Sequence, residues 1–82
     1  MFDSKPVMTV STRHNTYTLT ERGILYRHKG IGVWEEVEDL PFGHDDPATH
    51  VSATLHDPGS LLLTSKGGKI SMYTGSGWIK LA

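Results

Sequence analysis

The sequence predicts an all-β fold made of two repeated antiparallel units, each of about four short strands. Apolar residues recur with a period of two along most of the chain, which is typical of half-buried strands, and no segment shows the 3.6-residue period of a helix. A similar order of residues also occurs twice, with Trp34 in the first copy and Trp78 in the second, 44 positions apart. Repeats of about 40 to 50 residues decide the architecture of a chain, so this spacing predicts two copies of one β unit.

Several residues keep the same offset along the two copies. The aligned pairs are Leu19/Leu63, Thr20/Thr64, Gly23/Gly67, Trp34/Trp78 and Val37/Leu81, and Val7/Val51 with Tyr17/Leu61 extend them toward the amino terminus. A slip of one residue additionally aligns Leu25/Ile70, Gly30/Gly75 and Gly32/Gly77. We therefore expect a single domain over 1–82, with one repeat at about 7–38, a connector at 39–50 and a second repeat at about 51–82.

In the first copy, strands are expected at 6–10, 16–20, 24–28 and 33–37. Each segment is short and rich in β-branched or aromatic residues, and glycine, asparagine or charged residues separate them. Gly23 falls in the turn between the second and third strands, where a residue that adopts positive φ without strain favours a tight hairpin. The 30–32 loop, Gly-Ile-Gly, then leads into the strand that carries Trp34.

The connector contains Pro41 and Pro47, which lack the backbone N–H that a strand ladder requires. It is therefore expected to join the last strand of the first unit to the first strand of the second. In the second copy, strands are expected at 50–55, 60–64, 69–73 and 78–81. The glycines at 67–68 and the 75–77 loop repeat the two turn positions of the first copy.

Composition excludes several classes of function. The 82 residues contain no cysteine, so there are no disulfides, thiolate metal ligands or cysteine nucleophiles. The net charge is −1, which gives no basic excess for nucleic acid or anionic lipid. No apolar run approaches the roughly 20 residues of a membrane span, and the amino terminus lacks the pattern of a signal peptide. We expect a soluble protein made in the cytoplasm, with no nucleic-acid partner and no membrane insertion.

The repeated order of a turn glycine, an alternating strand, a Gly-x-Gly loop and Trp-x-x-Val/Leu resembles a β-propeller blade. The 73–81 segment is similar to units of small two-repeat sugar-binding lectins and of bacteriophage tail and fibre proteins. In such lectins the resemblance implies a homotrimer of six blades, with sugar held by aromatic and charged groups between blades. Both copies could instead form one small barrel or sandwich of about eight strands, which the chain length also permits.

Trp34 and Trp78 are the main binding candidates, because an indole offers a large apolar face and one N–H donor. Four nearby residues, Tyr26, Tyr73, Arg27 and Glu36, could supply polar partners to a ligand. The structural alternative is that both tryptophans pack between the units or inside a barrel. We predict no catalytic residue, no cofactor and no metal ligand. His44, His50 and His56 lie beside acids, but two positions six apart on one strand are about 20 Å apart, too far for one ion.

The sequence therefore favours a non-catalytic binding or assembly module. The leading expectation is a small bacteriophage virion or tail-associated structural protein that binds copies of itself and neighbouring subunits. One alternative is a carbohydrate-binding lectin that forms an oligomeric propeller. Another is a small intracellular inhibitor that covers a host or defence protein with its acidic rim. The expected partners are thus the chain itself, other protein subunits and, for the lectin, glycans.

Overall fold

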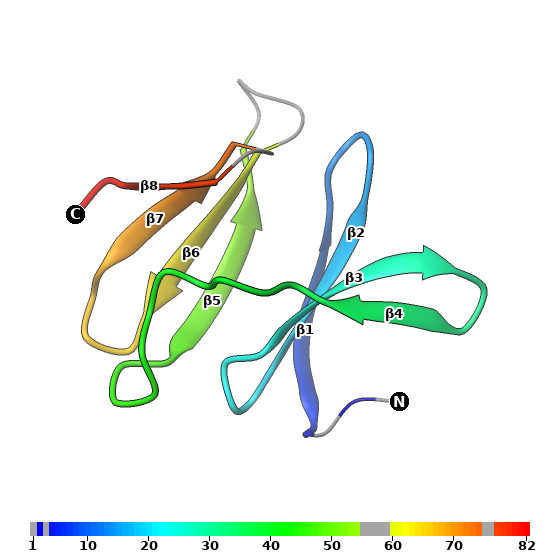
Figure 1. Cartoon of the computed structure of the whole chain (residues 1–82), viewed down its shortest axis with the longest axis horizontal. Helices are drawn as coiled ribbons and strands as arrows, with labels where there is room; N and C mark the ends of the chain where they lie inside the picture. Colours follow the sequence, from blue (N-terminus) through cyan, green and yellow to red (C-terminus); the bar gives the residue numbers. More distant parts are fainter. Residues whose placement is uncertain (1, 3, 55–59, 75–76) are drawn as a thin grey trace.

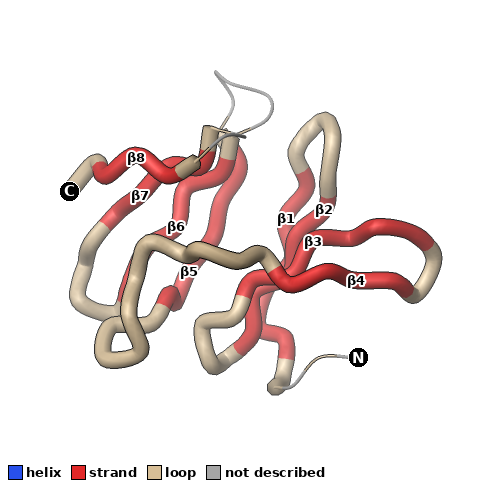
Figure 2. Tube along the Cα trace, viewed as in Figure 1, coloured by secondary structure: helices blue, strands red, loops and turns tan. Residues whose placement is uncertain are grey.

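The computed structural model describes residues 2, 4–54, 60–74 and 77–82, and in this part of the chain it contains strands and no helix (Figure 1, Figure 2). The strands form two antiparallel sheets, with the orders β1-β2-β3-β4 and β5-β6-β7-β8. Each sheet is a meander, in which every strand pairs with the next strand along the chain. The prediction of an all-β fold of two four-stranded units is confirmed.

The strands lie close to the segments expected from the alternation of apolar residues. The first sheet contains β1 (Pro6–Ser11), β2 (Thr16–Thr20), β3 (Leu25–Gly30) and β4 (Val33–Glu36). The second contains β5 (Ala48–Ala53), β6 (Leu61–Ser65), β7 (Ile70–Tyr73) and β8 (Trp78–Lys80). β5 begins earlier than the expected 50–55 strand, because Ala48 already pairs with Ser65 across a register shift between Ala48 and His50. Residue 55 lies outside the described residues.

The two sheets have the same register, which establishes which residues are equivalent. Each cross-strand pair of the first sheet has a counterpart in the second. Thr9↔Thr18 corresponds to Val51↔Leu63, Tyr17↔Arg27 corresponds to Leu62↔Met72, and His28↔Trp34 corresponds to Tyr73↔Trp78. Even the register shift within β1, between Pro6 and Met8, recurs in β5 between Ala48 and His50. The structure thus contains one four-stranded unit twice.

This register corrects part of the alignment made from the sequence. From β2 to β6 the offset is 45 positions, from Tyr17 to Leu62, whereas the tryptophans keep an offset of 44. Gly23 corresponds to Gly68 and not to Gly67, since both have positive φ, at 82° and 92°. The N–H of each also donates to the carbonyl three residues earlier. Leu19/Leu63, Thr20/Thr64 and Tyr17/Leu61 are therefore not equivalent pairs, while the slipped pair Leu25/Ile70 is.

Because side chains alternate across a strand, each sheet has two faces, which we name by the same rule in both units. The front face of the first sheet carries Met8, Val10, Tyr17, Leu19, Leu25, Arg27 and Glu35, and its back face carries Thr9, Ser11, Thr16, Thr18, Tyr26, His28, Trp34 and Glu36. In the second sheet the equivalent front face carries His50, Ser52, Leu62, Thr64, Ile70, Met72 and Ile79, and the back face carries Val51, Ala53, Leu61, Leu63, Ser71, Tyr73, Trp78 and Lys80.

The core lies between the front face of the first sheet and the back face of the second. Its buried apolar residues are Tyr17, Leu19, Leu25, Ala48, Val51, Leu61 and Leu63, and Met8, Val10, Tyr73 and Trp78 pack at its margin. The sheets approach most closely at β1 and β5, where Cα atoms lie within 8 Å of each other. The opposite face of each sheet is not covered by the other sheet.

The connector crosses from β4 to β5 along one side of the molecule and is fastened to the second sheet (Figure 1). Asp46 accepts hydrogen bonds from the Ser65 hydroxyl at 2.8 Å and from the Gly67 N–H at 2.6 Å. The Lys66 N–H donates to the Pro47 carbonyl at 2.9 Å. These contacts position Pro47 and Ala48 directly over Gly23, where a Cβ atom would lie 2.9 Å from the Pro47 Cβ.

Candidate functional site

The six predicted binding residues do not form one site, because they lie in two places. Arg27, Glu36, Tyr73 and Trp78 line a cleft between the two sheets. Tyr26 and Trp34 lie on the back face of the first sheet, where Trp34 lines a separate shallow groove. Strand alternation separates Tyr26 from Arg27, since neighbouring residues project to opposite faces. Glu36 pairs with Tyr26 and lines the cleft from the end of β4.

Trp34 and Trp78 are nevertheless equivalent within their own sheets. Each faces an aromatic ring directly across from it, His28 for Trp34 and Tyr73 for Trp78. The ring centroids are 4.9 Å apart in the first pair and 5.0 Å apart in the second. The first sheet covers the back face that carries Trp78, whereas nothing in the other sheet covers the back face that carries Trp34.

The cleft between the sheets has a volume of about 440 Å³. Trp78 and Tyr73 form one wall, and Arg27 and Glu35 on the front face of the first sheet form the other. The remaining lining residues are Glu36, Val37, Glu38, Asp39 and Gly77. Arg27, Tyr73 and Trp78 are half-buried, whereas Glu35 is exposed at the mouth of the cleft.

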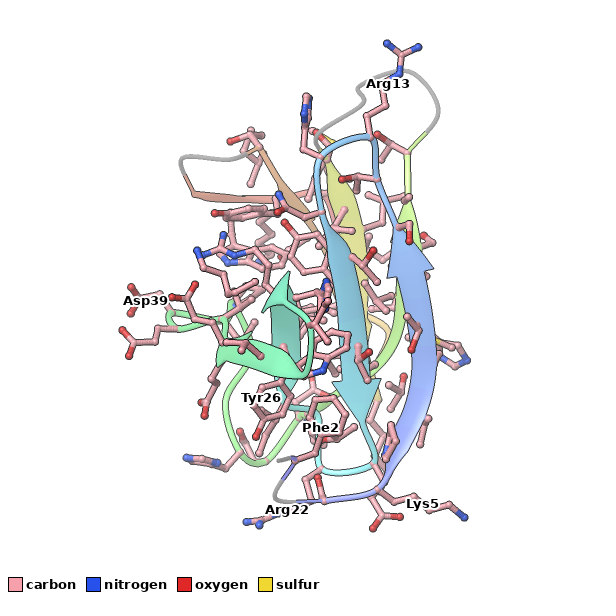
Figure 3. All side chains as sticks on the ribbon, turned by 90° about the vertical axis from the view of Figure 1, so that its right-hand side faces the viewer. Phe2, Lys5, Arg13, Arg22, Tyr26 and Asp39 are labelled. Atoms are coloured by element: carbon pink, nitrogen blue, oxygen red, sulfur yellow. The ribbon has the colours of Figure 1, made fainter. Side chains whose placement is uncertain are left out.

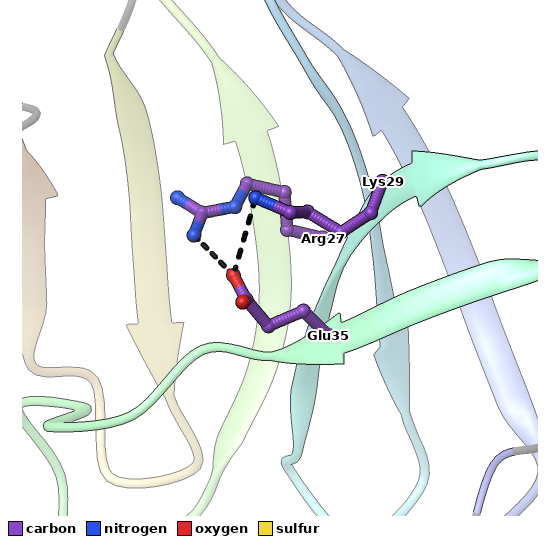
Figure 4. A network of polar contacts seen from close by, with 3 residues as sticks. All are labelled: Arg27, Lys29 and Glu35. Atoms are coloured by element: carbon purple, nitrogen blue, oxygen red, sulfur yellow. Dashed lines mark hydrogen bonds and ion pairs between the residues drawn. The ribbon is translucent and has the colours of Figure 1, made fainter.

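An ion pair shapes the wall opposite Trp78. The Arg27 guanidinium donates to the Glu35 carboxylate, and the Lys29 ammonium lies 3.8 Å from the same oxygen (Figure 4). The hydrogen bond from Arg27, with the charge of Lys29 beside it, holds the pKa of Glu35 below its usual range. Glu35 raises the pKa of Arg27 in turn. The Arg27 Nε is buried and has no hydrogen-bond partner among the described residues.

The other unit carries different residues at these positions. Met72 and Ile79 are the equivalents of Arg27 and Glu35. The ion pair is therefore not a feature of the repeated unit, and it occurs on the front face that the other sheet covers. Departures of this kind from an otherwise consistent pattern are concentrated at functional sites.

The back face of the first sheet carries a cluster of aromatic rings. The Phe2 side chain lies beside Tyr26 (Figure 3), with 4.7 Å between the ring centroids. The centroid of the Trp34 ring lies 5.3 Å from that of Phe2. Phe2 also borders the groove of about 430 Å³ that continues over Thr9, Thr16 and Thr18. This face is therefore aromatic toward β4 and hydroxyl-rich toward β1.

The front face of the second sheet is apolar toward β8 and polar toward β5. Leu62, Ile70 and Met72 are half-buried on it, and Ile79 is 49% exposed. His50 and Ser52 are exposed at the β5 side. Alternation along single strands does not reveal this face, because only the paired register assigns Leu62, Met72 and Ile79 to one surface.

The histidines considered as metal ligands do not come together in the described part of the chain. His44 lies in the connector and His50 on β5, while His56 and Asp57 lie outside the described residues. Among the residues described, no group of three or more histidines and acids is arranged to hold a metal ion. The same residues contain no helix that is long and apolar enough to cross a membrane.

The chain matches no protein-family model, no curated protein and no solved structure.

Proposed function

We propose that this protein is a non-catalytic assembly module, of the kind used by virion or tail structures, that joins protein subunits through the two uncovered sheet faces. One observation carries the proposal. Each sheet is covered by the other sheet on one face only, and both remaining faces carry large apolar or aromatic side chains. Trp34 and Phe2 lie on one of these faces, and Met72 and Ile79 on the other. Contiguous apolar patches at a protein surface mark sites of protein contact.

The arrangement of the two sheets supports a propeller-like form of this module. In a propeller, the front of each blade packs on the back of the next, so equivalent faces are never in contact with each other. The two sheets meet in this way, with Tyr17 and Leu19 on the front of one and Val51 and Leu63 on the back of the other. Two blades leave both ends open, and added subunits would cover them.

The test replaces one apolar residue on each uncovered face with a charge. Ile79→Glu and Trp34→Glu are expected to leave the folded chain intact and to abolish its association with protein subunits, measured by light scattering after chromatography. Glu21→Lys, in the exposed turn after β2, is the control, since it changes charge away from both faces. Association that survives both face variants would contradict the proposal.

A second candidate function is supported by the cleft, which brings Arg27, Glu35 and Trp78 together around about 440 Å³. An indole face packs against the C–H groups of a sugar ring, and a guanidinium–carboxylate pair supplies donors and acceptors for neighbouring hydroxyls. The cleft therefore supports the carbohydrate-binding alternative.

Intrinsic fluorescence tests this candidate in the Trp34→Phe variant, in which Trp78 is the remaining tryptophan. Titration with neutral mono- and disaccharides is expected to give a saturable change in its emission. Arg27→Met should remove that change. Without sugar, the variant should keep the emission of the folded protein. If no glycan on an array is bound and the fluorescence does not respond to any sugar, the carbohydrate-binding function is rejected.

A further inference from the structure

We infer that the front face of the second sheet binds the back face of the first sheet of another copy of this chain. The contact repeats the arrangement that joins the two sheets within one chain. This inference rests on the proposed assembly function and names the partner of the two uncovered faces. Subunits would then be added head to tail, because each contact joins the front face of one copy to the back face of the next.

The repeated register is the main reason for this assignment. Within the chain, a front face is joined to a back face, and the residues involved include Tyr17 and Leu25 on one side and Leu61 and Leu63 on the other. The uncovered faces are the remaining front and the remaining back of the same unit. Each is therefore equivalent, position by position, to a face that is already buried in this type of contact.

The chemistry of the two uncovered faces is complementary along their length. Toward β5 the front face offers His50 and Ser52, and toward β1 the back face offers Thr9 and Thr16. These side chains can form hydrogen bonds with one another in a partly hydrated contact.

Toward the outer strands the two faces differ. Met72 and Ile79 on the front face would meet Trp34 and His28 on the back face, where a thioether beside an aromatic ring is a favourable contact. The exposed Glu36 lies at the end of β4 on the same back face. Polar residues therefore meet polar residues toward β1 and β5, and apolar side chains meet the rings of Trp34 and His28 at the outer strands.

Phe2 strengthens the match at the outer strands. Within the chain, Trp78 borders the open cleft, because Arg27 and Glu35 stand opposite it. Between copies, the equivalent tryptophan is Trp34, and the Phe2 ring already lies against it. The contact between copies would thus be closed by apolar side chains, whereas the contact within the chain keeps a polar cleft.

One atomic contact within the chain predicts which two residues should meet between copies. The Val51 N–H donates to the Met8 sulfur at 3.2 Å, which joins β1 to β5 across the core. The equivalents of Met8 and Val51 are His50 and Thr9. His50 of one chain should therefore lie beside Thr9 of the next, and both side chains are exposed in the single chain.

Engineered cysteines test this pairing, because the chain has no cysteine of its own. Thr9→Cys and His50→Cys are introduced into two separate chains, one of them carrying a mass label. A disulfide needs Cα atoms within about 7 Å, so mild oxidation of the mixture reports close approach. Non-reducing electrophoresis and mass spectrometry should show a cross-linked pair of one labelled and one unlabelled chain, and neither variant alone should cross-link.

Controls separate this contact from random collision and from other geometries. Glu21→Cys and Lys66→Cys, in the exposed turns of the two units, form the matched pair outside both faces. We expect at least a tenfold faster cross-linking of the Thr9 and His50 variants than of this control pair. Equal rates would overturn the inference. Cross-linking of the His50→Cys chain with itself at the rate of the mixture would also overturn it, since that result requires a two-fold contact of identical faces.

Failure of this inference can be told apart from failure of the assembly function. If the uncovered faces bind a different subunit, the cysteine pair would not cross-link, but Ile79→Glu and Trp34→Glu would still abolish association with that subunit. If the faces have no assembly role, the cysteine pair would not cross-link and the charged variants would change no association.

Discussion

Trp34 and Trp78 occupy the same position of the repeated unit, each directly opposite an aromatic ring, but only Trp78 packs beside the core. The difference arises because the first sheet covers the back of the second and no further sheet covers the back of the first. Trp78 is therefore expected to contribute to the stability of the single chain, and Trp34 to a contact with another molecule. The sequence alone does not distinguish these two roles.

Trp78→Ala should lower the free energy of unfolding by about 2 to 3 kcal/mol, since it removes a large side chain that packs against the core. Trp34→Ala should cost less than about 1 kcal/mol in the single chain, because its partners His28 and Phe2 lie on an uncovered face. Urea unfolding of both variants at low protein concentration gives this comparison. Equal losses would show that Trp34 is as well packed as Trp78.

Gly23→Ala should be much more destabilising than Gly68→Ala, although both glycines have positive φ at equivalent turns. A Cβ at Gly23 would lie 2.9 Å from the Pro47 Cβ and 3.0 Å from the Ala48 N, and nothing lies within 4 Å of a Cβ at Gly68. We expect a cost of about 1 kcal/mol at Gly68, from backbone strain alone, and at least twice that at Gly23. Thermal unfolding of the two variants provides the measurement. Similar costs would mean that the connector does not press on the β2–β3 turn.

Asp46 should make the stability of the protein depend on pH in the acid range. Hydrogen bonds from Ser65 and from the Gly67 N–H lower its pKa below the usual value of 3.8. A carboxyl whose pKa is lower in the folded state stabilises the fold above that usual value, and the contribution is lost as pH falls through the lowered pKa. Wild type should therefore lose more stability than Asp46→Ala when pH is lowered through this range.

Asp45→Ala is the matched control for this pH series, because Asp45 is the exposed neighbour of Asp46 in the same connector. Its acid profile should follow that of wild type. An Asp46→Ala chain whose acid profile is also unchanged would contradict the role assigned to the two hydrogen bonds.

Replacement of the cleft ion pair by its counterparts from the second unit, Arg27→Met with Glu35→Ile, should leave the fold intact. A solvent-exposed ion pair contributes little to stability because water screens it, and two apolar side chains facing Trp78 would bury more apolar surface. The free energy of unfolding is therefore expected to stay the same or to rise, as measured by urea unfolding. A large loss of stability would show that the ion pair holds the sheets together, and it would remove the argument that the pair serves a ligand.

Much of the fold could be predicted from alternation and repetition, but the alignment of the repeats could not. Gly23 aligned with Gly67 in the sequence because two adjacent glycines, Gly67 and Gly68, satisfy the same pattern. Only the backbone conformation distinguishes them, since Gly68 is the one with positive φ. A shift of one residue moves every side chain of a strand to the opposite face, so this ambiguity concealed the front face of the second sheet.

The candidate site was predicted in part. Arg27, Glu36, Tyr73 and Trp78 do come together at one cleft, whereas Tyr26 and Trp34 lie on another surface. Alternation along the expected 24–28 strand already indicates that Tyr26 and Arg27 project to opposite faces, but only the packing of the two sheets determines which face lines the cleft. Phe2 could not be linked to Trp34 at all, because residues so far apart in the chain meet only through the packing of the first sheet.

The solution mass of the native chain, measured by light scattering over a concentration series, tests the head-to-tail account most directly. We predict a discrete assembly of several chains that dissociates to folded monomers in the Trp34→Glu and Ile79→Glu variants. The mixture of these two variants should recover a pair, because each keeps one intact face and the two intact faces are complementary. A wild-type chain that remains a folded monomer at the highest concentrations reached would contradict the account.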